Sequence, residues 1–278
     1  MNRRRRVPPT LIAGAVVVAL VVVAALVSLV WTPFDPRLAD TASRLLGPGV
    51  EGHLLGTDQY GRDLLSVVLA GSQVIVIVGV LAVGIAAVLG IPLGALAAVR
   101  GGWVGELVMR GSDVMYAFPA VLMALMLSAA YGSSTTTAMV AIGIAYVPVF
   151  ARVTRAASLQ VLTRDYVLAA RAYGRRSPYI VVRHVLPNIS SVLIVQATVA
   201  FALAVLAEAA LSYLGVGTQP PTPSWGRMLK DSQTFLDSAP RLALWPGLAI
   251  AAVVLGLNLL GDGLRDRYDP HAHIEGRP

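Results

Sequence analysis

The sequence contains no cysteine, which excludes disulfide bonds and thiolate metal sites. Charged residues are also scarce: they make up 13% of the 278 residues, whereas hydrophobic residues make up 56%. In an ordinary soluble domain, about a quarter of the residues are charged. The shortage of charge and the excess of apolar residues therefore exclude a typical soluble protein and predict a membrane protein with several spans.

Lysine is nearly absent, since Lys230 is the only one beside 21 arginines. Lys230 has none of the glycine-rich context of a GxxxxGK[ST] phosphate-binding loop. The motifs HExxH and GxSxG are absent as well. His271 and His273 are interpreted as solvated residues of a polar tail. We therefore expect no catalytic residue, no metal site and no cofactor on this chain, and do not expect it to be an enzyme.

Six apolar stretches can cross a bilayer, which requires about 20 helical residues at about 1.5 Å each. The six predicted spans are residues 11–30, 74–99, 114–130, 137–151, 189–214 and 242–260. The first is longer than the apolar core of a signal peptide and lacks a small-x-small cleavage site before Trp31. The fourth is short and contains Pro148. The predicted fold class is an all-α integral membrane protein with six transmembrane helices.

Positive charge is concentrated between alternate spans. Sixteen of the 22 lysine and arginine residues fall in four segments, which are the N-terminus with Arg3–Arg6, residues 100–113, residues 152–188 and the tail. The positive-inside rule places these segments, and both termini, in the cytoplasm. It also explains the net charge of +7 without nucleic-acid binding. We expect three regions: an N-terminal region with the first span and an extracytoplasmic segment (1–72), the main transmembrane domain (73–262) and a cytoplasmic tail (263–278).

The most informative polar stretch, residues 152–188, holds seven arginines and one acid, Asp165. Asp165 favours the start of a short helix through the helix dipole. Four residues then recur at i, i+3, i+4 and i+7 on one face: Tyr166, Ala169, Ala170 and Tyr173. Gly174 follows, where helices commonly end in a left-handed residue.

A second short helix is predicted after this break. Ser177 and Pro178 are typical of an N-cap followed by proline at the first helical position, and Pro187 is predicted to end the helix. Two interpretations are open for the stretch. It is a basic loop that obeys the positive-inside rule, or it is a docking element whose small residues let the backbone of another protein come close.

The stretch resembles the EAA loop in membrane subunits of ABC importers. That pattern is Glu-Ala-Ala, three residues, Gly, nine residues, Ile, one residue and Leu-Pro; here Ala169-Ala170, Gly174 and Leu186-Pro187 have its spacing. Leu168 replaces the glutamate, and His184 replaces the isoleucine. Loops in the dipeptide, oligopeptide and nickel branch of the family often end in a similar RHVLPN. We call residues 165–187 the coupling loop.

Other stretches resemble the same branch. They are GTDQYGRDLLS (56–66), AEAALSYLGVG followed by TQPPTPSWGRML (207–229), and GDGLRDRYDP (261–270). The first either contacts a binding protein or substrate, or forms a structured cap in which Asp58, Arg62 and Asp63 satisfy each other or backbone groups. The second interpretation is favoured. Together these motifs extend the resemblance over nearly the whole chain.

The resemblance implies a type I ABC importer permease that forms half of a pathway for peptides. Its partners would be a homologous permease, two ATPase subunits or domains that bind ATP and Mg²⁺, an extracytoplasmic substrate-binding protein and membrane lipid. The implied ATPase-docking residues are Asp165, Tyr166, Ala169, Ala170, Tyr173, Gly174, Ser177, His184, Leu186 and Pro187. A permease for nickel or another small solute remains open, as does a membrane scaffold or receptor whose basic loop binds a regulator or anionic lipid.

Glu208 is an ionisable residue inside the fifth predicted span. A carboxylate at that depth is costly unless it meets a cavity, a partner or water. One hypothesis places Glu208 in the pathway or at a gate. The alternative is a hydrogen-bonding anchor near the membrane surface, or a contact with the sister subunit.

Overall fold

The computed structural model describes residues 8–268, and these residues contain isolated bridges but no strand. The helices are α1 (Pro9–Val30), α2 (Leu64–Arg100), α3 (Gly102–Tyr116), α4 (Ala120–Tyr131), α5 (Thr135–Leu162), α6 (Asp165–Ala172), α7 (Ser177–Ile180), α8 (Leu186–Leu214), α9 (Trp225–Ser232) and α10 (Arg241–Tyr268). Short 3-10 turns cover Thr41–Ser43 and Gln233–Phe235, and a π turn covers Val181–Val185. Arg3–Arg6 and the tail histidines lie outside the described residues.

Five helical segments are long and apolar enough to cross a membrane, or six if the bent pair of α3 and α4 counts as one span. The prediction of an all-α membrane protein is confirmed. The 37 residues of α2 extend about 55 Å, which exceeds a hydrocarbon core of about 30 Å. The expected boundary at residue 72 falls inside α2, so one helix joins the N-terminal region to the transmembrane domain.

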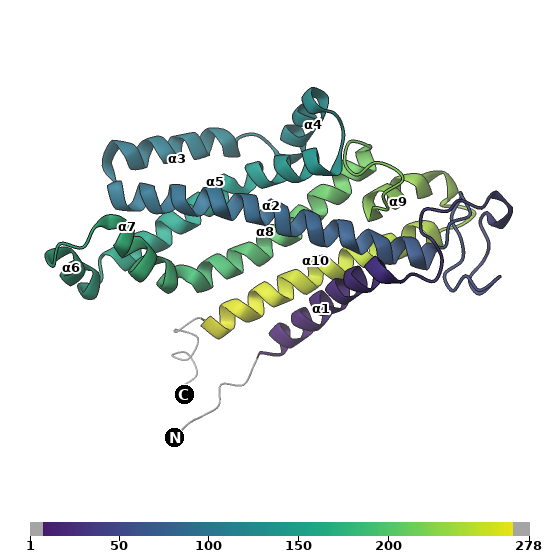
Figure 1. Ribbon diagram of the computed structural model, residues 1–278, viewed down its shortest axis with the longest axis horizontal. Helices are drawn as coiled ribbons and strands as arrows, with labels where there is room; N and C mark the ends of the chain where they lie inside the picture. Colours follow the sequence, from purple (N-terminus) through teal and green to yellow (C-terminus); the bar gives the residue numbers. More distant parts are fainter. Residues whose placement is uncertain (1–7, 269–278) are drawn as a thin grey trace, which may run out of the picture.

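The bundle has two distinct ends (Figure 1). The segment between α1 and α2, residues 31–63, lies at one end together with α9; we call this segment the cap. Helices α6 and α7 project at the opposite end. Because α1 runs toward the cap and α10 runs away from it, the start of α1 and the end of α10 lie on the side of α6 and α7.

Helices α2 and α5 share the most extensive contact in the bundle, and small residues line it. A Cβ atom added to Gly90 would lie 2.6 Å from the Cβ atom of Phe150. One added to Gly94 would lie 2.3 Å from the carbonyl oxygen of Ala151. Close backbone approach through small residues is the usual basis of helix association in membranes, where lipid removes the hydrophobic drive.

The third predicted span, residues 114–130, is wrong as a single straight helix. The chain breaks at Ala117–Pro119, and α3 and α4 meet at 79°. Pro119 has no N–H to donate and disfavours a helical conformation at the residue before it. The predicted turn at 100–113 is also wrong, because most of it forms α3, which lies beside α2 (Figure 1).

The fourth predicted span, residues 137–151, proves to be too short. Helix α5 has 28 residues and continues through Pro148 to Leu162. Arg152 falls in the predicted loop 152–188, but it lies on this helix and contacts the neighbouring α3. It donates to Asp113 over 2.8 Å, and its guanidinium lies 4.5 Å from the ring centre of Tyr116. These contacts hold the arginine side chain against α3.

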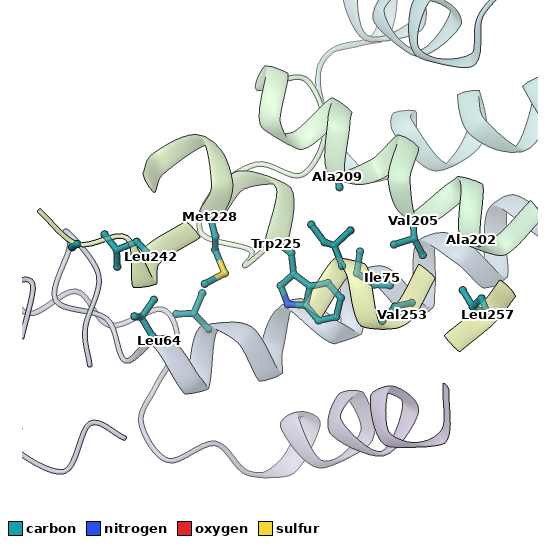
Figure 2. Close-up of a cluster of buried hydrophobic side chains, with 13 residues drawn as sticks. Leu64, Ile75, Ala202, Val205, Ala209, Trp225, Met228, Leu242, Val253 and Leu257 are labelled. Carbon is teal, nitrogen blue, oxygen red and sulfur yellow. The ribbon is translucent and has the colours of Figure 1, made fainter. Parts of the chain in front are cut away.

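A buried cluster joins α2, α8, α9 and α10 near the cap (Figure 2). Trp225 of α9 is 3% exposed, and its indole N–H donates to the carbonyl oxygen of Val68 over 2.9 Å. Figure 2 shows its ring among the side chains of this cluster, near the ribbon of α2. The tryptophan therefore fastens α9 onto the spanning helices.

Candidate functional site

Helix α6 stands away from the bundle and is held by a single buried side chain. It begins at Asp165, as predicted, and only Val167 is buried, at 0% exposure. Most of the predicted face is open to solvent: Tyr166 and Tyr173 are 45% and 87% exposed, Ala169 is exposed, and Ala170 is half-buried. A helix with so little of its surface covered is available to a partner.

Gly174 ends α6 in the way its position predicts. Its φ is +74°, a left-handed conformation that favours glycine. The N–H of Arg175 donates to the carbonyl oxygen of Ala170 over 3.1 Å, and that of Gly174 donates to Arg171 over 2.9 Å. This pair of hydrogen bonds is a Schellman motif. It reverses the chain sharply after Tyr173 and keeps α6 short.

The predicted end of the second helix at Pro187 is wrong. Ser177 starts α7, without a hydrogen bond from its side chain, and a continuous helical segment runs from there to Leu214. The π turn at Val181–Val185 explains how Pro187 is accommodated. In it the N–H of Leu186 donates to Val181, five residues earlier, instead of four. This widened turn makes room for a ring that clashes with the preceding turn of an α-helix.

His184 joins the two short helices of the coupling loop. Its ring centre lies 5.9 Å from that of Tyr166 on α6 and 5.8 Å from that of Tyr179 on α7. Its carbonyl oxygen accepts a hydrogen bond from the Asn188 side chain over 2.6 Å. The histidine at the isoleucine position of the motif therefore packs between aromatic rings. Leu168, at the glutamate position, is 49% exposed.

A small apolar cluster anchors the coupling loop to the bundle. It joins Val167, Ile180 and Val185 of the loop to the membrane helices through Ala98, Leu162 and Ile189. The side chains of Val167 and Val185 are fully buried in it. Residues of α2, α5 and α8 all contribute, so this cluster packs α6 against three long helices.

Glu208 lies near the other end of α8 and is 1% exposed. Its Oε1 atom accepts three hydroxyl hydrogen bonds, from Ser212 at 2.6 Å, Thr218 at 3.1 Å and Ser224 at 2.9 Å. Thr218 and Ser224 belong to the loop between α8 and α9, so the carboxylate fastens that loop. This geometry favours the anchor hypothesis, and a role in the pathway or at a gate stays a prediction.

The GTDQYGRDLLS motif forms a structured cap, as the sequence predicts. Asp58 accepts backbone N–H groups of Tyr60 and Arg62 over 2.8 and 2.9 Å and pairs with the Arg62 side chain at 2.7 Å. Asp63 caps α2 by accepting the N–H of Ser66 over 2.8 Å. Within the same cap, hydrogen bonds from Ser43 and Ala42 hold the pKa of Asp40 below its usual value.

Two long-range contacts of the cap had no signal in the sequence. His53 contacts Asp63 over 2.9 Å. The guanidinium of Arg241, at the start of α10, donates to the carbonyl oxygens of Leu45 and Leu46 over 2.8 and 3.0 Å. The second contact joins positions almost 200 residues apart, and no spacing rule connects them. No cluster of three metal-binding side chains occurs within residues 8–268.

A family model described as the inner membrane component of binding-protein-dependent transport systems matches residues 90–274. The chain belongs to this family. Relatives in the family cover most of the chain. The dipeptide transport system permease protein DppC of Alkalihalophilus pseudofirmus is 39% identical and aligns over 93% of this chain and 85% of its own. The glutathione transport system permease protein GsiD of Escherichia coli is 39% identical and aligns over 96% of this chain and 88% of its own.

Another member is the di/tripeptide transport system permease protein DppC of Pseudomonas aeruginosa, which is 42% identical over 86% of this chain and 80% of its own. Among solved structures, a chain of the MetNI methionine ABC transporter, in an inward-facing form, aligns with a TM-score of 0.59 and 20% identity, over 70% of this chain and 93% of that one. At this identity the likeness shows the fold alone, and it confirms the transmembrane fold of a type I ABC importer.

Proposed function

We propose that this chain is the permease subunit of an ATP-driven importer of di- or oligopeptides and forms half of the translocation pathway. A homologous permease forms the other half, and an extracytoplasmic binding protein delivers the substrate. ATP and Mg²⁺ bind to two ATPase subunits or domains, and this chain does no catalysis. The relatives named for dipeptide, di/tripeptide and glutathione transport support the peptide class.

The observation that carries the proposal is the exposed helix α6, held by Val167 and ended by Gly174. The aligned small residues Ala169 and Ala170 leave room for the backbone of an ATPase. Movement of the ATPases then shifts α6, the apolar cluster transmits the shift to α2, α5 and α8, and these rigid helices alternate the access of the pathway.

The proposal fixes an orientation in the cytoplasmic membrane. The coupling loop faces the cytoplasm, and the cap faces the other side. The termini share the cytoplasmic side with the coupling loop, in agreement with the positive-inside rule. The start of α1 and the end of α10 lie toward the end of the bundle that carries α6, which supports this arrangement (Figure 1).

The decisive experiment measures transport-coupled ATPase activity of the assembled complex in proteoliposomes. Gly174→Trp adds bulk at a strained backbone position, and Ala170→Asp adds charge to the exposed face; we expect both to abolish coupling. Thr163→Asp places the same charge at an exposed position outside the face and serves as the matched control. Full coupling in both test variants would remove the docking assignment.

Two further measurements separate the alternatives. Co-purification of an ATPase with this chain supports the transporter, whereas a chain that purifies as a stable unit alone supports a scaffold or receptor. Uptake of labelled dipeptides and oligopeptides is then compared with uptake of Ni²⁺ in the same proteoliposomes. Nickel uptake without peptide uptake would contradict the peptide assignment while leaving the docking assignment intact.

A further inference from the structure

A cavity of about 380 Å³ lies where α1 ends and the cap begins. Its walls come from the last turns of α1, the cap segment 32–37, the first turns of α2 and the loop before α9. Gln73 of α2 donates to Ser28 of α1 over 2.9 Å, and both residues line the cavity. The cavity is therefore a built feature between two helices that are fastened to each other.

Two opposite charges line this cavity. The cap contains three arginines, and two of them have partners: Arg44 donates to the carbonyl oxygen of Gln59 over 2.6 Å, and Arg62 pairs with Asp58. The third, Arg37, is exposed and lines the cavity, and its guanidinium has no hydrogen-bond or ion-pair partner within residues 8–268. Asp35 lines the cavity too, and one of its oxygens accepts the backbone N–H of Arg37 over 2.8 Å.

The length of α1 places the cavity at the expected depth of lipid headgroups. The 22 residues of α1 extend about 33 Å, close to the thickness of the hydrocarbon core, so Val30 marks one boundary of that core. Trp31 follows at 61% exposure, in the position that favours tryptophan at a membrane surface. Arg37 therefore lies beyond the boundary, among phosphates, while Ser28 and Gln73 lie at it.

Exposed apolar residues of α1 border the cavity. Leu29 lines the cavity and is 65% exposed, and Leu26, one turn earlier on α1, is 59% exposed. Only 11% of the residues in the apolar stretch of α1 are buried. An acyl chain lying against α1 would thus place its headgroup at the cavity without leaving the bilayer.

We propose that this cavity binds the headgroup of a membrane phospholipid. The guanidinium of Arg37 holds the phosphate, because its planar fork matches phosphate oxygens and the bond is charge-assisted. Asp35 faces the same cavity and selects a headgroup that carries an ammonium, as in phosphatidylethanolamine, over the anionic phosphatidylglycerol. Free inorganic phosphate shares only the contact with Arg37, and it gains nothing from Leu29 and the apolar surface of α1.

Native mass spectrometry of the assembled transporter, titrated with single lipids in mild detergent, tests this site. The unaltered complex is expected to bind phosphatidylethanolamine more tightly than phosphatidylglycerol and much more tightly than diacylglycerol, which lacks phosphate. Arg37→Ala is expected to lower the affinity for phosphatidylethanolamine at least about tenfold, which is the effect of losing a hydrogen bond to a charged group. Arg110→Ala removes an exposed arginine elsewhere and is expected to change nothing.

Two arms keep the proposal falsifiable if Arg37→Ala assembles poorly. Asp35→Asn is expected to reverse the preference toward phosphatidylglycerol, and Arg37→Lys is expected to retain part of the affinity. Equal binding of diacylglycerol and phosphatidylethanolamine, or displacement of the lipid by millimolar inorganic phosphate, would overturn the assignment. Unchanged lipid binding by Arg37→Ala would also overturn it. So would an assembled complex in which the sister permease covers this cavity and excludes lipid.

Discussion

Ser224 donates its hydroxyl to Oε1 of Glu208 over 2.9 Å, and this bond fixes the end of the α8–α9 loop to the spanning helix. Thr218 donates to the same oxygen from the first half of the loop. One carboxylate oxygen thus sets the position of the proline-rich segment 219–223. Residues of that segment line two cavities at the cap end of the bundle.

Replacing Glu208 by alanine should destabilise the protein. The change removes the shared acceptor of three buried hydroxyl groups, and each buried group without a partner costs about 1–3 kcal/mol. Glu208→Gln keeps a carbonyl oxygen as acceptor, so it should lower the melting temperature of the purified complex much less. The measurement is thermal unfolding of both variants beside the unaltered complex.

Transport by Glu208→Gln separates the two hypotheses for this residue. An anchor predicts near-normal peptide uptake once the variant is assembled, because the hydrogen bonds remain. A residue of the pathway or gate that acts through its charge predicts a large loss of uptake without a change in melting temperature. The second result would contradict the anchor.

The sequence could identify Glu208 as exceptional but could not choose its role. Hydropathy marks any acid in a span, whereas the outcome depended on Thr218 and Ser224, which lie 10 and 16 residues further on. Their approach depends on how the loop folds back across the end of α8. No periodicity in the sequence encodes that path.

Val167 is expected to control coupling although it faces away from any partner. It is the one buried side chain of α6 and sits in the cluster with Ile180 and Val185. Val167→Ala removes packing worth about 1–3 kcal/mol, and Val167→Asp adds a buried carboxylate without a partner. Helix α6 should loosen while the spans stay folded.

Hydrogen exchange over residues 165–175 and transport-coupled ATPase activity check this prediction. Exchange should rise, and coupling should fall further for Val167→Asp than for Val167→Ala. Thr163→Ala, at an exposed neighbouring position, is the control. Normal coupling in Val167→Asp, despite faster exchange, would show that α6 needs no rigid attachment.

The elements that could be predicted are those set by local rules. Asp165 starts α6 because a negative charge is favoured at a helix N-terminus, and Gly174 ends it because glycine readily adopts a left-handed conformation. Both effects act within one turn of the helix. Pro119 and Pro187 were harder, since proline can break a helix or be absorbed by it. Pro119 separates α3 and α4 at 79°, whereas a π turn carries the helix through Pro187. Neighbouring helices decide between these outcomes, and a single sequence does not specify them.

Asp63 should be important for the junction between the cap and α2. Its side chain is 1% exposed, accepts the N–H and the hydroxyl of Ser66, and contacts His53. Asp63→Ala should cost about 2 kcal/mol, the upper end of the range for a lost helix N-cap, because its partners are buried too. Asp63→Asn keeps an acceptor and should cost less. Thermal unfolding measures both changes. Melting temperatures equal to that of the unaltered complex would show that Asp63 contributes no stability at this junction.

The orientation of the chain can be tested directly because it has no cysteine. Tyr173 in the coupling loop is 87% exposed and Leu54 in the cap is 66% exposed, so Tyr173→Cys and Leu54→Cys each introduce one accessible thiol at opposite ends of the bundle. In spheroplasts, a membrane-impermeant maleimide should label Leu54→Cys and leave Tyr173→Cys unmodified. Permeabilised cells that produce this chain without its ATPase partner should label both, which controls for accessibility. If the pattern in intact spheroplasts is reversed, the coupling loop faces away from the cytoplasm, no ATPase can reach it, and the importer proposal fails.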